Sequence, residues 1–109
     1  MQTISLIALL RGKHKMLGPH LIVAPLSTLS NWINEFSMWT PEVPVVMYHG
    51  KPEQRNAIFA RLQKQIGRGK PTEQFPVVCT SYEMIIRDHK DLSRINWEFI
   101  IIVSVPLPY

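Results

Sequence analysis

The pattern of hydrophobic and polar residues switches along the chain between a helical period and short continuous apolar runs. Apolar residues three and four positions apart, together with capping patterns, predict helices over residues 3–10, 27–39 and 52–66 and from residue 80 onward. The first helix is apolar nearly all round, which is typical of a helix buried on most faces. In the second, an apolar stripe runs from Leu29 to Trp39. Ser27 or Thr28 can cap the free amides at its start.

Short apolar runs lie between the predicted helices and indicate buried strands. They cover residues 21–24, 43–48, 75–80 and 99–103. The last run has four β-branched aliphatic residues after an aromatic one and is expected to be the most buried. Strands that alternate with helices at this spacing predict an α/β fold, in which helices cover both faces of a parallel sheet.

Composition limits the classes of protein that remain. A chain of 109 residues with 46% hydrophobic residues fits one domain or part of one. Twelve basic and eight acidic residues give a net charge of +4, which permits an anionic partner such as nucleic acid without requiring one. A single cysteine, Cys79, excludes an intrachain disulfide framework and suits a reducing, intracellular compartment. No apolar run approaches the ~20 residues of a membrane span, and no signal peptide is expected.

Common catalytic and metal-binding patterns are missing from the sequence. The histidines show no spacing typical of metal ligands with carboxylates; they are His14, His20, His49 and His89. Cys79 falls inside a predicted strand, where it is expected to be an inert small hydrophobe. Residues 1–109 contain no glycine-rich phosphate loop and no Gly-x-Ser-x-Gly elbow. We therefore assign no catalytic, cofactor-binding or metal-binding residue.

The informative positions follow the predicted strands. Ligands of open parallel sheets bind beyond the carboxyl ends of the strands, and hydroxyls and amides at such places suit phosphate. The candidate residues, here called the strand-end residues, are Pro25, Leu26, Ser27, Thr28, His49, Gly50, Thr80, Ser81 and Tyr82. A plainer interpretation is that their hydroxyls only cap helices.

Aromatic and basic residues have two interpretations each. Trp32 and Trp39 share a helical face and are expected in the core rather than stacked on nucleic-acid bases. The basic residues assigned to loops form either a solvated surface or a rim that contacts phosphates; they are Arg11, Lys13, Lys15, Arg68 and Lys70.

Several strings of residues resemble the first RecA-like lobe of the SNF2 family of ATP-dependent DNA translocases. They are Gln2–Ile7, Pro25–Trp32 (similar to motif Ia), Tyr48–Gly50 (motif Ic), Val77–Glu83 (motif Ib) and Trp97–Val103 (the strand that leads into the Walker B box). The resemblance covers residues 2–103 and implies a partial RecA-like lobe of the P-loop NTPase type. Within the family, the lymphoid-specific helicase branch looks most similar, on Tyr48–Gly50, Lys64–Gln74, Pro76–Val78, Thr80–Ser81 and Arg87–Asp88.

The resemblance also implies a division of the chain and a loss of chemistry. Residues 1–103 correspond to the partial lobe, and residues 104–109 form a Pro-rich tail that does not match. In the family, a Gly-x-Gly-Lys-Thr loop precedes the position of Met1, and an Asp-Glu-x-His box follows that of Val103. Ser104–Leu107 stands in place of that box. The intact family uses ATP and Mg²⁺. We expect these 109 residues alone neither to bind ATP usefully nor to hydrolyse it.

By the same resemblance, the strand-end residues match positions that track the phosphate backbone of one DNA strand. The implied partners are DNA, bound without sequence preference, and nucleosomes, and the implied location is the nucleus; the oligomeric state is not indicated. Two other interpretations stay open. The chain is a non-catalytic DNA-binding or protein-interaction module derived from such a lobe, or an unrelated α/β domain whose motifs are only helix caps.

Overall fold

A computed structural model describes residues 2–13, 17–66 and 75–103. Its elements are α1 (Gln2–Gly12), β1 (His20–Val23), the 3₁₀ turn η1 (Leu26–Thr28), α2 (Leu29–Trp39), β2 (Val45–Tyr48), α3 (Pro52–Ile66), β3 (Val77–Thr80), α4 (Tyr82–Arg87), α5 (His89–Leu92) and β4 (Phe99–Ile102). All the predicted helices and strands are present, with ends shifted by up to two residues. The Pro-rich tail, His14, Lys15, Arg68 and Lys70 lie outside the described residues.

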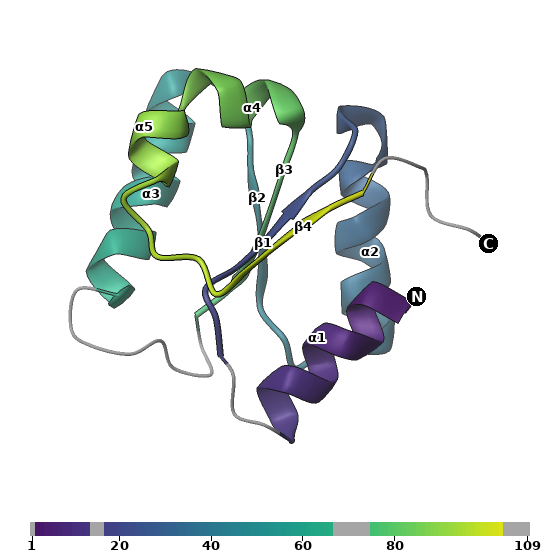
Figure 1. The fold of residues 1–109 in the computed structure, drawn as a ribbon. Helices are drawn as coiled ribbons and strands as arrows, with labels where there is room; N and C mark the ends of the chain where they lie inside the picture. Colours follow the sequence, from purple (N-terminus) through teal and green to yellow (C-terminus); the bar gives the residue numbers. More distant parts are fainter. Residues whose placement is uncertain (1, 14–16, 67–74, 104–109) are drawn as a thin grey trace.

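The strands form one parallel sheet in the order β2-β3-β1-β4 (Figure 1). Only β2 and β3 are neighbours in the sheet and also consecutive strands in the chain; because all the pairs are parallel, every connection is a crossover. The predicted α/β class is therefore confirmed.

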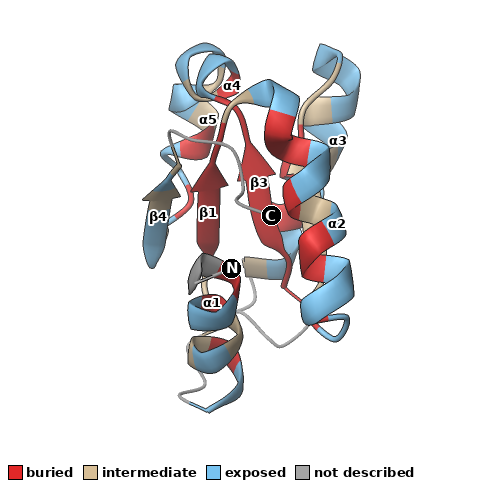
Figure 2. Cartoon of the chain, turned by 90° about the vertical axis from the view of Figure 1, so that its right-hand side faces the viewer, coloured by how far each residue is buried: buried red, intermediate tan, exposed pale blue. Residues whose placement is uncertain are grey.

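Helices cover both faces of the sheet, as predicted. Along β1, Ile22 packs with α1 and α2, whereas Leu21 and Val23 pack with α3, α4 and α5. This alternation follows from the two-residue period of a strand and divides the core in two. Both central strands, β1 and β3, are buried along their whole length (Figure 2).

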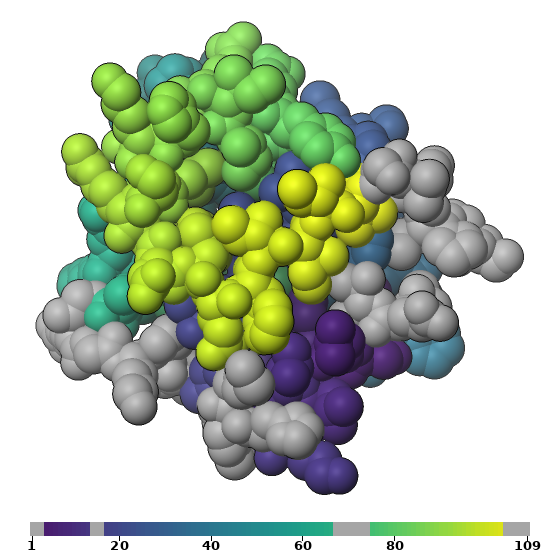
Figure 3. Space-filling model, in the orientation of Figure 1, coloured from purple at the N-terminus to yellow at the C-terminus, as the bar shows by residue number. Residues whose placement is uncertain are grey.

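Strand β4 is not the most buried strand, contrary to the prediction. It lies at one edge of the sheet, where it pairs with β1, and crosses the front face in Figure 3. Ile100 and Ile102 are 54% and 65% exposed. A run of β-branched residues predicts a strand but says nothing of its place in the sheet, and the place decides the exposure.

Two further expectations about single residues are wrong. Trp39 is 62% exposed, because it lies in the last turn of α2; its indole Nε1 donates a 2.7 Å hydrogen bond to Oε2 of Glu35. Arg11 belongs to α1 rather than to a solvated loop and is only 5% exposed. Its guanidinium donates hydrogen bonds to the carbonyl oxygens of Leu17 and Phe75, which satisfies part of its buried charge.

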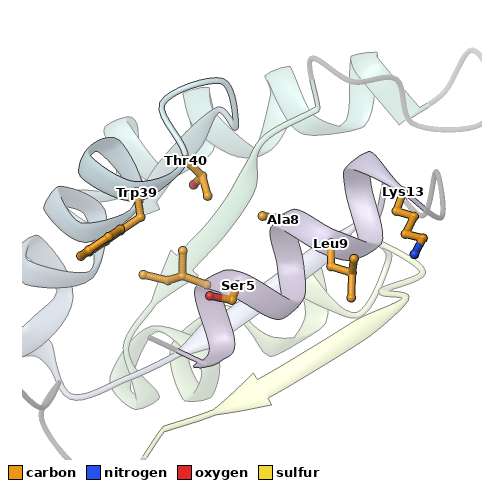
Figure 4. Close-up of a pocket in the computed structure, with 7 residues that line it drawn as sticks. Ser5, Ala8, Leu9, Lys13, Trp39 and Thr40 are labelled. Atoms are coloured by element: carbon orange, nitrogen blue, oxygen red, sulfur yellow. The ribbon is translucent and has the colours of Figure 1, made fainter.

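Helix α1 is less covered than its apolar sequence predicts. Ile4 and Ile7 are buried, but Leu6 and Leu9 are about half exposed. Between α1 and the end of α2 lies a largely apolar groove of about 570 Å³ (Figure 4). Among the described residues, no helix is long and apolar enough to cross a membrane.

Candidate nucleic-acid interface

The carboxyl ends of β2, β3 and β1 meet at one edge of the sheet, towards the upper end of Figure 1. Thr80 ends β3 and pairs in register with Tyr48 on one side and Val23 on the other. Its hydroxyl donates a 2.8 Å hydrogen bond to the carbonyl oxygen of Tyr48, and its own carbonyl accepts one of 3.0 Å from the amide of Ala24. The three segments that carry the strand-end residues are therefore neighbours.

The turn after β1 holds Pro25–Thr28. The Thr28 hydroxyl donates to the carbonyl oxygen of Pro25 at 2.8 Å, and neither Ser27 nor Thr28 caps α2 through its side chain. The predicted cap is thus wrong: the 3₁₀ turn η1 leads directly into α2, and its own backbone hydrogen bonds replace the side-chain cap. Leu26 and Ser27 are exposed, and Thr28 is buried.

The turn after β2 is built around Gly50. Its φ is +120°, a conformation that residues with a Cβ rarely adopt, and an added Cβ would collide with the Gln54 side chain. Oε1 of Gln54 accepts a 2.8 Å hydrogen bond from the amide of Lys51, and Nη1 of Arg55 donates one of 2.9 Å to the carbonyl oxygen of Gly50. The turn is therefore held from the first turn of α3.

The turn after β3 directs two of its three side chains inward. Thr80 is fully buried, and Ser81, 3% exposed, accepts a 3.3 Å hydrogen bond from the amide of Met84. The capping-box spacing from Thr80 to Glu83 predicts Thr80 as the N-cap of α4. The N-cap is instead Ser81, because the Thr80 hydroxyl donates to the carbonyl oxygen of Tyr48. Tyr82 is 40% exposed, and its hydroxyl donates to the carbonyl oxygen of Val103 at 3.0 Å.

The structure brings the strand-end residues together, but it does not present them equally. Leu26, Ser27 and Tyr82 are exposed and His49 is half-buried, whereas Thr28, Thr80 and Ser81 use their hydroxyls inside the protein. Whether they bind DNA stays a prediction. Arg11, one of the basic residues considered above, lies away from these turns. It hydrogen-bonds Leu17 and Phe75, which precede β1 and β3, so it lies at the amino ends of the strands.

The sequence did not reveal a cluster of hydrogen-bonded side chains next to the turn after β2. Oδ2 of Asp88 accepts hydrogen bonds from the Tyr48 hydroxyl at 2.7 Å and from Nε of Arg55 at 2.8 Å. Burial and the neighbouring Asp88 carboxylate raise the pKa of Tyr48 well above its usual range. One weak signal in the sequence is the position of Arg55 in the first turn of α3, where the helix dipole disfavours a cation and an anionic partner would offset the effect.

The described side chains offer little for nucleophilic or metal chemistry. Burial raises the pKa of the Cys79 thiol to about 12, so it stays protonated and unreactive at neutral pH. No group of three His, Cys, Asp or Glu side chains among the described residues is placed to hold a metal ion. Nε2 of His20 and Oε1 of Glu98 form a hydrogen bond of 3.0 Å, a pairing that the sequence does not predict. Burial lowers the pKa of His20.

The known proteins similar to this chain in sequence indicate one family. The family described as SNF2-related domain matches residues 1–103. The chain is 45% identical over 101 residues to the ATP-dependent helicase brm of Drosophila melanogaster, covering 93% of this chain and 6% of that protein. It is 43% identical over 102 residues to the ISWI chromatin-remodeling complex ATPase ISW1 of Saccharomyces cerevisiae, covering 94% and 8%. For the chromatin structure-remodeling complex subunit snf21 of Schizosaccharomyces pombe, the identity is 42% over 101 residues, covering 93% and 8%.

These similarities do not single out one branch. The three relatives carry different names, their identities to this chain differ by only a few percentage points, and none is named as a lymphoid-specific helicase. The chain spans less than a tenth of the length of each of them.

Proposed function

Since the chain belongs to the SNF2-related domain family, we propose that its three strand-end turns contact the phosphate backbone of one DNA strand. The observation that carries the proposal is their placement: the turns after β1, β2 and β3 lie on neighbouring strands and are joined through Thr80. They correspond to motifs Ia, Ic and Ib of the resemblance. The chain would thus be the DNA-tracking part of the ATP-binding lobe of an SNF2-type translocase.

The chemistry of the exposed groups suits a phosphate backbone. The hydroxyl of Ser27 and the ammonium of Lys51 are exposed beside two of the turns. Such donors contact phosphate oxygens whatever the base, so the binding would be independent of sequence and weakened by salt.

ATP and Mg²⁺, which the family resemblance implies, do not fit the residues present. The described residues hold no cluster of potential metal ligands, and Ser104–Leu107 supplies no carboxylate. We therefore propose that these 109 residues alone do not hydrolyse ATP. Phosphate release above a no-protein control, in the presence of DNA, would contradict this.

The surroundings of the domain are part of the same proposal. Since relatives are named as subunits or ATPases of chromatin-remodeling complexes, we propose that residues 1–103 act within a nuclear protein that works on nucleosomes. The lymphoid-specific helicase branch remains our proposal for its subfamily, on the strings Tyr48–Gly50 and Arg87–Asp88.

DNA binding by the purified chain tests the proposal. A fluorescein-labelled duplex of random sequence is titrated with protein, and anisotropy is recorded at several salt concentrations. We expect weak binding, with the same affinity for a second duplex of unrelated sequence. A plot of the logarithm of the association constant against the logarithm of the salt concentration should fall, with a slope of about −0.9 for each phosphate contact. A folded chain, as judged by circular dichroism, that shows no salt-dependent binding would overturn it.

Protein contact is a second candidate function, and the exposed apolar residues favour it. Ile100 and Ile102 on β4 and Trp39 beside the groove are each more than half exposed. Exposed apolar patches of this kind mark interaction surfaces. Concentration-dependent sedimentation that is abolished by Ile100→Lys would support this candidate.

A further inference from the structure

The side chains of Arg55 and Asp88 form one connected cluster with the two turns after β2 and β3. Asp88 lies at the junction of α4 and α5, 33 positions from Arg55. Nε of Arg55 donates to Oδ2 of Asp88 at 2.8 Å, and Nη1 of the same guanidinium donates to the carbonyl oxygen of Gly50 at 2.9 Å. One planar group therefore joins the Gly50 turn to the helix that follows Thr80 and Ser81.

This pair is more shielded from water than the Arg87–Glu83 and Arg94–Asp91 pairs at the surface. The Arg55 and Asp88 side chains are only 11% and 15% exposed, whereas Arg87 and Glu83 are 60% and 55% exposed. An ion pair shielded from water gains little net stability, because desolvation opposes the attraction between the charges. In some proteins such a pair instead fixes the relative position of the groups it joins. Here the planar fork of Arg55 reaches two acceptors at once.

A third hydrogen bond extends the cluster to the sheet. The hydroxyl of Tyr48 donates to Oδ2 of Asp88 at 2.7 Å, and the carbonyl oxygen of Tyr48 accepts from the Thr80 hydroxyl. Tyr48 and Thr80 are register partners at the carboxyl ends of β2 and β3. The two turns are thus joined at the strand ends by the sheet, and the ion pair joins the Gly50 turn to the C-terminal end of α4, the helix that begins at Tyr82.

We propose that Arg55 and Asp88 are positioning residues for DNA: they hold the His49–Gly50 turn and the Thr80–Tyr82 turn at a fixed separation, so that both contact phosphates of one strand at the same time. The inference rests on the proposed function of the strand-end turns. Neither residue needs to touch DNA itself. Loosening the pair would leave each turn folded but would let the distance between the turns vary, which weakens the simultaneous contact.

The test compares Arg55→Lys with Arg61→Lys in the 109-residue chain. Both changes keep the net charge, so the long-range attraction for DNA is unaltered. The ammonium that Arg55→Lys introduces lacks the fork that joins Asp88 to Gly50, whereas Arg61 is an exposed residue of the same helix. Affinity for the labelled duplex is measured against salt, and circular dichroism at the same temperature checks that each variant is folded.

For Arg55→Lys we expect a loss of affinity of about tenfold, and a salt slope lower by about 0.9, which corresponds to one phosphate contact. Arg61→Lys should have the same affinity and the same salt slope as the unchanged chain. A purely structural role would lower the unfolding midpoint and leave the salt slope of the folded protein unchanged, and that result would overturn the inference.

Two outcomes separate this inference from the proposed function. If the unchanged chain is folded and does not bind DNA, the proposed function fails and the positioning role fails with it. If the unchanged chain binds and Arg55→Lys binds equally with the same slope, only the positioning role fails. Should Arg55→Lys not fold, Asp88→Asn decides, because it removes the carboxylate that pairs with Arg55. Asp91→Asn, at a more exposed carboxylate, is its control for the same change of charge. A salt slope equal to that of the control would contradict the inference.

Discussion

The hydroxyl of Thr80 donates a 2.8 Å hydrogen bond to the carbonyl oxygen of Tyr48, its register partner on the neighbouring strand. Thr80 is fully buried, so this contact satisfies a hydroxyl that has no access to water. It explains why Thr80 does not cap α4 and why Ser81 does. A residue that looks like a helix cap in sequence is instead a link between two strand ends.

Replacing Thr80 by valine tests that link. Thr80→Val keeps the shape of the side chain but removes the donor, and we expect the free energy of unfolding to fall by about 1 to 2 kcal/mol. Urea denaturation followed by circular dichroism measures the change. Thr80→Ser, which keeps the hydroxyl, is the matched control and should lose less than Thr80→Val. Equal stability of the valine variant and the unchanged chain would show that the hydrogen bond contributes nothing.

The elements of the fold are readable from the sequence because they depend on short-range patterns. The stripe from Leu29 to Phe36 and the capping residues before α4 each act within a few residues, and both predict helices that are present. The class follows from the alternation of these elements.

What the sequence does not reveal depends on distant partners. The edge position of β4, and with it the exposure of Ile102, follows from the strand order, which no local pattern contains. The pairing of Arg55 with Asp88 joins residues 33 positions apart. The placement of the strand-end turns together was predictable from parallel strands, but which of their hydroxyls point inward, as those of Thr80 and Ser81 do, was not.

Loss of the Ser81 side chain should weaken the start of α4. Ser81→Ala removes the acceptor of the Met84 amide, and N-cap substitutions of this kind cost about 0.5 to 2 kcal/mol. Ser37→Ala, at an exposed position within α2, is the control and should change stability by less. Urea denaturation of the two variants side by side measures the difference, and an equal effect on both would rule out a capping role for Ser81.

Acidification should destabilise the chain through His20. Burial is the main cause that lowers the pKa of His20, with a small contribution from Arg11, while its hydrogen bond to Glu98 opposes the change. The unfolded chain therefore takes up this proton first as the pH falls below about 6.5. The contribution of neutral His20 to the free energy of unfolding is fully present above that pH. It is lost as the pH falls through the lower pKa of His20 in the folded state.

Unfolding in urea at about pH 7.5 and about pH 5.5 measures this loss, since the reference pKa of histidine lies between the two. His20→Gln should show a smaller decrease between the two pH values than the unchanged chain. His89→Gln, at an exposed histidine, is the control and should retain the full decrease. If His20→Gln retained it too, the pH dependence would have to come from another group.

Gly50 should tolerate substitution poorly. Its φ of +120° disfavours any residue with a Cβ, and the added carbon of Gly50→Ala would also collide with the Gln54 side chain. We expect Gly50→Ala to lower the free energy of unfolding by about 1 to 2 kcal/mol, the cost of a left-handed conformation for an ordinary residue. Gly12→Ala is the opposite case, because it lies in α1 with nothing within 4 Å of the added carbon. It should raise stability by about 0.5 to 1 kcal/mol.

The double variant Gly50→Ala/Gln54→Ala separates the two causes of that loss. Removing the Gln54 side chain abolishes the collision but leaves φ unchanged. If backbone strain dominates, the double variant stays less stable than Gln54→Ala alone by nearly the full cost of Gly50→Ala. If the collision dominates, the double variant and Gln54→Ala unfold at the same urea concentration. The first result is expected, because a flexible glutamine side chain can move away, whereas the path of the turn is fixed by the Arg55 hydrogen bond to the carbonyl oxygen of Gly50.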